Sequence, residues 1–159
     1  MRVAKMFKDE LLASYQPEAL AELNARFTRF KTQGSHEMVT VGPVPFSSLC
    51  AHHLLPFHGT AHVGYIPDKW LVGLSKIPRV VEHFARTLQM QERMTTQIAD
   101  YIHSNLQPQG LIVLVEARHL CMECRGVKTS GAVTRTSALR GAAKTSSEVR
   151  DEFYRLLSR

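Results

Sequence analysis

Apolar residues along the chain follow two different periods, and each period predicts a type of element. They recur at roughly four-residue intervals across residues 2–15, which predicts a first helix. β-branched residues before a Gly-Pro pair predict a strand over residues 37–44. Apolar residues then alternate with polar ones over residues 59–66, which predicts a second strand, and a short apolar run at residues 70–74 predicts a third.

The period becomes helical again in the middle of the chain. Over residues 77–88 the apolar residues fall on one helix face, and a second helical stretch over residues 94–106 ends before Pro108. A continuous apolar run at residues 111–117 predicts a strand that is buried on both faces. The Thr-rich residues 132–138 predict the next strand.

The final helix is predicted to begin at a capping box formed by Thr145 and Glu148. Strands are adjacent in sequence and helices group together, which predicts an α+β fold with a mainly antiparallel sheet. One face of the strand at residues 132–138 carries only small or polar side chains, so we expect it to contact another subunit. The 159 residues are expected to form a single domain over residues 1–159.

The formal net charge of +6 favours an anionic partner such as a phosphorylated small molecule. Nucleic acid is not the expected partner, because the basic residues are scattered and form no block of like charge. The charged start of the chain lacks a signal-peptide pattern, and no apolar run approaches the roughly 18 residues of a membrane span. We therefore expect a cytoplasmic protein that is not bound to a membrane.

The cysteines form two half-sites with the spacing of metal ligands. Cys50 and His53 are separated by two residues, as are Cys121 and Cys124. Together they could make a closed structural zinc site. Alternatively, three of them could hold the ion and leave the fourth position to a water molecule, which the ion would make acidic. The spacing alone leaves both arrangements open.

Two histidines lie beside these half-sites, His52 next to His53 and His119 just before Cys121. Adjacent residues in a turn point in different directions, so His52 and His53 are not expected to bind the same ion. A free imidazole near an acidified water could act as a general acid or base. The alternative for each histidine is an ordinary hydrogen-bonded position in the core or on the surface.

Two weaker signals concern an anion site and a carboxylate. Ser75 could cap the helix that follows it. The first backbone N–H groups of that helix, together with Lys76 and Arg79, could bind an anion. Glu92 lies in a charged run that is typical of a solvated surface. A buried carboxylate there could instead accept two hydrogen bonds from a guanine, through N1–H and the exocyclic amine.

Three stretches resemble the GTP cyclohydrolase I family: CAHHLLPFHGTAHVGYIP, VGLSKIPRVVEHFARTLQMQERMT and EARHLCMECRGVKTSGAVTRTSALRG. The resemblance runs from Arg2 to about Gly141 and includes the final helix. It implies the tunnelling fold, in which a sheet with a helix pair on one face joins its neighbours into an oligomeric barrel. It also implies a homodecamer of two pentamers, with active sites between subunits. The implied reaction converts GTP and water into 7,8-dihydroneopterin triphosphate and formate, the first step towards tetrahydrofolate or related pterins.

By position, the resemblance assigns the ligands of a zinc ion to Cys50, His53 and Cys121, and the catalytic roles to His52 and His119. Cys124 matches a position that the family does not use for metal. In the implied reaction a zinc-activated water attacks C8 of the purine, His119 donates a proton to the purine nitrogen, and formate is lost. His52 would then act as the acid that opens the ribose.

The resemblance also implies residues that hold the substrate. Gln91 and Glu92 match the position that reads guanine. A second set matches residues that bind the triphosphate and ribose, several of them supplied by neighbouring subunits: Arg2, Ser75, Lys76, Arg79 and Arg125.

Two features depart from the family pattern. Family members usually carry further helical sequence before RVAKM, which here begins at Arg2. The usual motif is Cys-Glu-His-His, whereas this chain has Ala51 in place of the acid. Alanine cannot orient a neighbouring histidine or tune its pKa. The alternatives are therefore a slower enzyme, a paralogue with another purine substrate, arrest at the ring-opened formamidopyrimidine, or a non-catalytic nucleotide-binding homologue.

Overall fold

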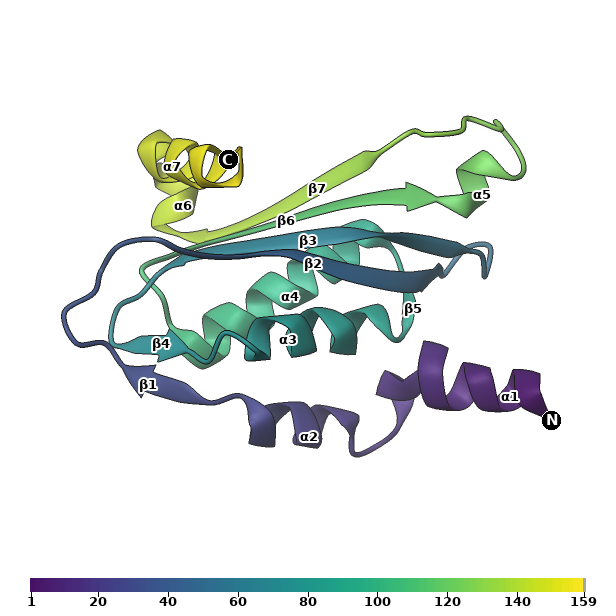
Figure 1. Ribbon diagram of the computed structural model, residues 1–159, viewed down its shortest axis with the longest axis horizontal. Helices are drawn as coiled ribbons and strands as arrows, with labels where there is room; N and C mark the ends of the chain where they lie inside the picture. Colours follow the sequence, from purple (N-terminus) through teal and green to yellow (C-terminus); the bar gives the residue numbers. More distant parts are fainter. Residues whose placement is uncertain (159) are drawn as a thin grey trace.

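The computed structural model describes residues 1–158 and contains a five-stranded sheet with helices on both faces (Figure 1). The strand order is β5-β2-β3-β6-β7, and every neighbouring pair is antiparallel except β2 and β5. The strands are β2 (Val39–Cys50), β3 (Pro56–Ile66), β5 (Leu88–Gln89), β6 (Gly110–His119) and β7 (Thr134–Gly141). The predicted α+β fold with a mainly antiparallel sheet is confirmed.

A helix pair, α3 (Lys76–Ala85) and α4 (Gln91–Leu106), covers one face of the sheet (Figure 1). The apolar face predicted for α3 is buried against the strands, as are Met94, Ile98 and Ile102 of α4. Burial of these side chains is the main stabilising term of such a layered fold. The helical period was predicted to reach Leu88, but that residue instead begins β5.

A second, smaller layer lies on the opposite face, where α6 (Ala142–Thr145) and α7 (Ser147–Leu157) pack over one end of the sheet (Figure 1). Ile112 of β6 and Phe153 of α7 are buried between them. The predicted cap is displaced by one residue, because the hydroxyl of Ser146 rather than that of Thr145 accepts from the backbone N–H of Val149. Thr145 already belongs to α6.

Part of the Thr-rich face, which was expected to contact another subunit, is covered by α4 of the same chain. In β7, Thr136 and Ala138 pair with Val115 and Val113 and share their face of the sheet, which α4 covers. The hydroxyl of Thr136 lies 2.7 Å from that of Thr95 on α4. This face is polar because it forms hydrogen bonds to the helix within the same chain.

The N-terminal region differs most from its prediction. The single helix predicted over residues 2–15 is divided into three helical segments: α1 (Arg2–Met6), η1 (Phe7–Leu11) and η2 (Ala13–Tyr15). Two elements were not predicted, α2 (Ala19–Arg26) and β1 (Arg29–Lys31). β1 pairs with β4 (Trp70–Val72) in a separate two-stranded sheet, so the predicted strand at residues 70–74 is confirmed.

The Gly-Pro pair at residues 42–43 was predicted to end a strand, but it does not. β2 continues through it to Cys50, and the register with β3 shifts between Val41 and Val44. Proline is tolerated within a sheet at such a bulge, where its missing N–H leaves no ladder bond unmade. None of the helices among residues 1–158 combines the length and apolar character needed to cross a lipid bilayer.

Candidate metal and catalytic site

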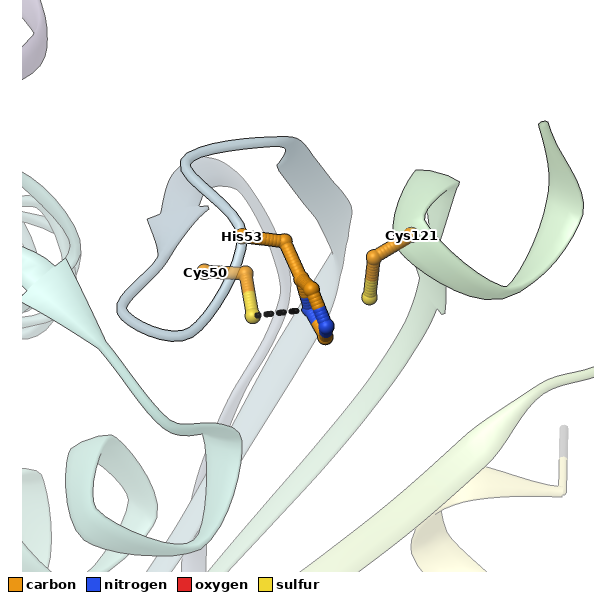
Figure 2. Close-up of side chains that lie close together, drawn as sticks. All are labelled: Cys50, His53 and Cys121. Carbon is orange, nitrogen blue, oxygen red and sulfur yellow. Dashed lines mark hydrogen bonds between the residues drawn. The ribbon is translucent and has the colours of Figure 1, made fainter. Parts of the chain in front are cut away.

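The topology of the sheet brings the two predicted half-sites together. β2 and β6 are both antiparallel to β3, so they run in the same direction and their C-terminal ends lie at the same end of the sheet. Cys50 is the last residue of β2, and Cys121 follows β6 in the short helix α5 (Leu120–Glu123). Residues 71 positions apart in sequence are thereby brought together at one end of the sheet (Figure 2).

Cys50, His53 and Cys121 form a compact group of metal-ligating side chains (Figure 2). Their ligand atoms all lie within 4.8 Å of one another. The Cys50 Sγ and His53 Nδ1 are 3.7 Å apart, close to the separation of about 3.6 Å expected for a thiolate and an imidazole on one tetrahedral zinc ion. Cys50 is buried, whereas His53 is exposed, so the group opens towards solvent on one side.

The turn between β2 and β3 places His53 back over Cys50. The Cys50 carbonyl accepts from the backbone N–H of Leu54, and the Cys50 N–H donates to the carbonyl of Leu55. Leu54 has a positive φ of 55°, an uncommon conformation for a bulky residue. The tight turn brings the side chains of Cys50 and His53, three positions apart in sequence, to one point, as the spacing predicted.

The electrostatics of the two thiols favour a bound cation. Burial and the neighbouring Cys50 raise the pKa of the Cys121 thiol, while Arg125 opposes this rise more weakly. Two thiolates this close repel each other, and a divalent cation between them removes the repulsion. Two sulfur ligands with one imidazole suit zinc better than a hard ion such as magnesium. The residues present therefore fit a zinc ion.

Cys124 is not a member of this group. Its exposed thiol donates to the carbonyl of Leu120 at 2.8 Å, one helical turn earlier. Among residues 1–158, the ligand group contains Cys50, His53 and Cys121 without Cys124. The geometry thus favours three protein ligands over the closed four-residue arrangement.

His52 lies beside the metal group but is turned differently from its neighbour. The rings of His52 and His53 are 6.0 Å apart and inclined by 67°. The Nδ1 atom of His52 is 3.8 Å from the Cys50 Sγ, and the side chain is exposed. An exposed imidazole here can meet a substrate that approaches the metal group.

His119 is held much more firmly than His52. It ends β6 opposite Phe57 of β3, and the two rings stack at 4.8 Å with an angle of 1° between their planes. Phe57 is fully buried and meets the ring of Phe46 edge-on. Burial lowers the pKa of His119, and the nearby Glu92 carboxylate partly opposes this. The neutral ring is therefore favoured.

Gln91 and Glu92 occupy the first turn of α4, next to His119. The short strand β5 brings this turn to the site, because Gln89 pairs with Cys50 and the N–H of Ala51 donates to the Gln89 carbonyl at 2.8 Å. Glu92 is exposed and acts on His119 through its charge. Gln91 is 1% exposed, and its Oε1 lies 2.8 Å from the Nε2 of His119.

The remaining residues predicted to bind substrate lie elsewhere. Ser75, Lys76 and Arg79 are at the start of α3, whose opposite end leads into β5 and the metal group. A ten-residue helix separates its ends by about 15 Å. Within the described part of the chain, Ser75 forms no side-chain capping bond, contrary to its predicted role. Arg2 is exposed on α1, and Arg125 is exposed but close enough to Cys121 to influence its pKa.

Comparison with known proteins shows the family. The family model described as GTP cyclohydrolase I matches residues 1–158. The chain belongs to the GTP cyclohydrolase I family. The resemblance found in the sequence is thereby confirmed.

Relatives named GTP cyclohydrolase 1 are similar over much of the chain. The protein of Chlorobaculum tepidum is 56% identical over 126 residues, which are 79% of this chain and 56% of the relative. That of Campylobacter jejuni subsp. doylei is 53% identical over 124 residues, 78% of this chain and 65% of the relative. The Porphyromonas gingivalis protein is 46% identical over all 159 residues, 80% of its own length. The chain thus spans less than two thirds of the first two relatives.

A solved structure shares the fold at low sequence identity. It is the archaeosine synthase QueF-Like in its apo form, with a TM-score of 0.52 and 14% identity over 69% of this chain and 97% of that one. At this identity the likeness concerns the fold alone, which is the tunnelling fold expected for the GTP cyclohydrolase I family.

Sequence reasoning missed two contacts of His119 that the structure shows. They are the stacking of its ring on Phe57 and the hydrogen bond to Gln91, which was predicted only to read guanine together with Glu92. The strand pattern did not include this pair, because the predicted strands covered residues 59–66 and 111–117, whereas β3 begins at Pro56 and β6 ends at His119. Nothing in the sequence pointed to the hydrogen bond of Gln91.

Proposed function

We propose that this protein is a zinc-dependent hydrolase that converts GTP and water into 7,8-dihydroneopterin triphosphate and formate. The observation that carries the proposal is the convergence of Cys50, His53 and Cys121 on one point, with His52 beside Cys50 and His119 at the end of β6, just before Cys121. Family membership and the named relatives support the same reaction. The product would serve tetrahydrofolate or related pterin biosynthesis.

Cys50, His53 and Cys121 would hold the zinc ion as the ligands of an open site. When bound, zinc makes a coordinated water acidic enough to supply hydroxide near neutral pH, which suits attack on C8 of a purine. The exposed side of His53 leaves room for such a substrate.

The protein's own side chains would orient the substrate and move its protons. Glu92 would accept hydrogen bonds from N1–H and the exocyclic amine of guanine, since its carboxylate is exposed next to His119. His119, whose ring is neutral at rest, would take up a proton released by the water that attacks C8 and would pass that proton to the purine nitrogen as the five-membered ring opens. His52 would act as the acid for opening the ribose, after which rearrangement and ring closure give the pterin.

The triphosphate would be held by a basic set that a single chain does not bring together. Arg125 lies near the metal group, whereas Ser75, Lys76 and Arg79 lie at the far end of α3. Arg2 is on the exposed α1. This separation supports active sites shared between subunits, and with the family resemblance it supports a homodecamer of two pentamers. A cytoplasmic location stays a prediction from the sequence.

An assay that follows metal and both products tests the proposal. Purified protein should carry about one zinc per chain and should release formate from GTP in step with the fluorescent pterin. Protein that holds zinc but releases no formate from GTP would refute the proposal. Formate release without pterin would favour the alternative of arrest at the formamidopyrimidine.

Ala51→Glu tests the departure from the usual family motif. Ala51 is exposed between Cys50 and His52, so a glutamate fits there and its carboxylate would accept a hydrogen bond from His52 and orient it. We expect faster pterin formation from the variant, with formate release unchanged or faster. Formate by enzyme-coupled assay and pterin by fluorescence should be followed separately. Unchanged rates of both would show that alanine at this position does not limit the reaction.

A further inference from the structure

The side-chain amide of Gln91 forms several hydrogen bonds to the sheet. Its side-chain nitrogen lies 3.0 Å from the carbonyl oxygen of Val115, 3.0 Å from that of Thr134 and 3.1 Å from the hydroxyl of Thr136. The side chain is 1% exposed. It therefore ties the start of α4 to both β6 and β7.

These contacts fix which end of the amide is nitrogen. Main-chain carbonyl oxygens only accept hydrogen bonds, so the Gln91 group facing Val115 and Thr134 must be the NH₂. The hydroxyls of Thr136 and Thr95 are 2.7 Å apart, and Thr95 donates to the main-chain carbonyl of Gln91 at 2.7 Å. This network returns to Gln91 itself and opposes rotation of the amide.

The orientation of the amide determines the protonation pattern of His119. With its nitrogen committed to the strands, Gln91 presents Oε1 to the Nε2 of His119 at 2.8 Å. An amide oxygen cannot donate, so Nε2 must carry the proton. In the neutral ring the lone pair is then on Nδ1. The reverse tautomer would place two acceptors against each other.

We propose that Gln91 is a positioning residue that holds His119 in the tautomer protonated on Nε2, which leaves Nδ1 as the nitrogen for proton transfer. The role of His119 in this proposal rests on the proposed function, whereas the tautomer rests on the hydrogen bonds alone. Stacking on Phe57 fixes the plane of the ring, and Gln91 fixes its rotation within that plane. The exposed carboxylate of Glu92 is left to read the purine.

The direct test is the tautomer of His119 in the unaltered enzyme. Zinc-loaded protein labelled with ¹⁵N-histidine can be sedimented and studied by solid-state NMR at about pH 8, where a histidine with an ordinary pKa is neutral. The spectrum of His119→Asn identifies the resonances. We expect Nε2 to have a directly bonded proton and Nδ1 to have the shift of an unprotonated nitrogen. A proton on Nδ1 would overturn the proposal without the need for any Gln91 variant.

Gln91→Met adds a kinetic readout, because methionine has a similar length but cannot accept the bond from His119. We expect the ¹⁵N chemical shifts of the two ring nitrogens of His119 to move towards each other as both tautomers become populated. We expect kcat to fall about 10–100-fold, with KM changed less than about 3-fold. Thr136→Val is the matched control, since it weakens the same network but leaves both carbonyl acceptors of the amide in place. It should retain the native tautomer and most of kcat.

The possible results separate this proposal from the proposed function. A Gln91→Met enzyme with native tautomer and native kcat would overturn the positioning role, as would equal losses of kcat in Thr136→Val and Gln91→Met. If the unaltered protein releases no formate, the proposed function fails. The NMR spectrum then still decides whether Gln91 sets the tautomer.

Discussion

Replacing Cys121 with serine is expected to release the metal and abolish formation of the pterin. A serine hydroxyl is a much poorer zinc ligand than a thiolate, and the remaining Cys50 and His53 would hold the ion only weakly. Zinc per chain, measured by elemental analysis after dialysis, should fall from about one to near zero. Because burial of β6 does not depend on the Cys121 thiol, the fold should persist, which circular dichroism can check.

Cys124→Ser is the matched control for this change, because both cysteines lie in or next to α5, three residues apart. The Cys124 thiol donates to the carbonyl of Leu120, and a serine hydroxyl can do the same. Zinc and turnover should therefore be retained. Loss of zinc from Cys124→Ser and its retention in Cys121→Ser would restore the closed structural site as the better interpretation.

Replacing His119 with alanine should reduce turnover by about 10²–10⁴-fold while leaving zinc in place. His119 is not a member of the metal group, but its ring lies in the same end of the sheet, stacked on Phe57. In the proposed reaction its proton is needed for ring opening, so formate and pterin should be lost together. Single-turnover measurements with GTP, following formate and fluorescence in parallel, give both rates.

His52→Ala provides the comparison for His119→Ala. Its side chain is exposed next to Cys50, and its proposed role comes later, at the opening of the ribose. We expect zinc to be retained and pterin formation to fall more than formate release. Loss of zinc from either histidine variant would mean that ligand and acid–base residues had been exchanged in the assignment.

Much of this site followed from residue types and spacing. The two-residue gaps in the half-sites reflect local turn geometry, which a sequence reports well, and Cys50, His53 and Cys121 do converge. The choice between three and four ligands did not follow from spacing. It depends on the direction of the Cys124 side chain, whose thiol donates a hydrogen bond to the Leu120 carbonyl one helical turn earlier.

Two differences from the predicted fold have a common physical origin. The polar face of β7 was assigned to another subunit because polar residues are rare in a core, yet Thr136 is satisfied by Thr95 and Gln91 from α4. Such pairing between distant segments is invisible to a periodicity argument. The short β5 was absorbed into a helix for the same reason, since its two residues form a strand only by pairing with the distant end of β2.

That two-residue strand also links the end of β2, which carries Cys50, directly to the first turn of α4. Gln89 pairs with Cys50, its carbonyl accepts from Ala51, and Gln91 and Glu92 follow immediately. Any displacement of the turn that carries the metal ligands is therefore passed directly to the residue proposed to read the purine.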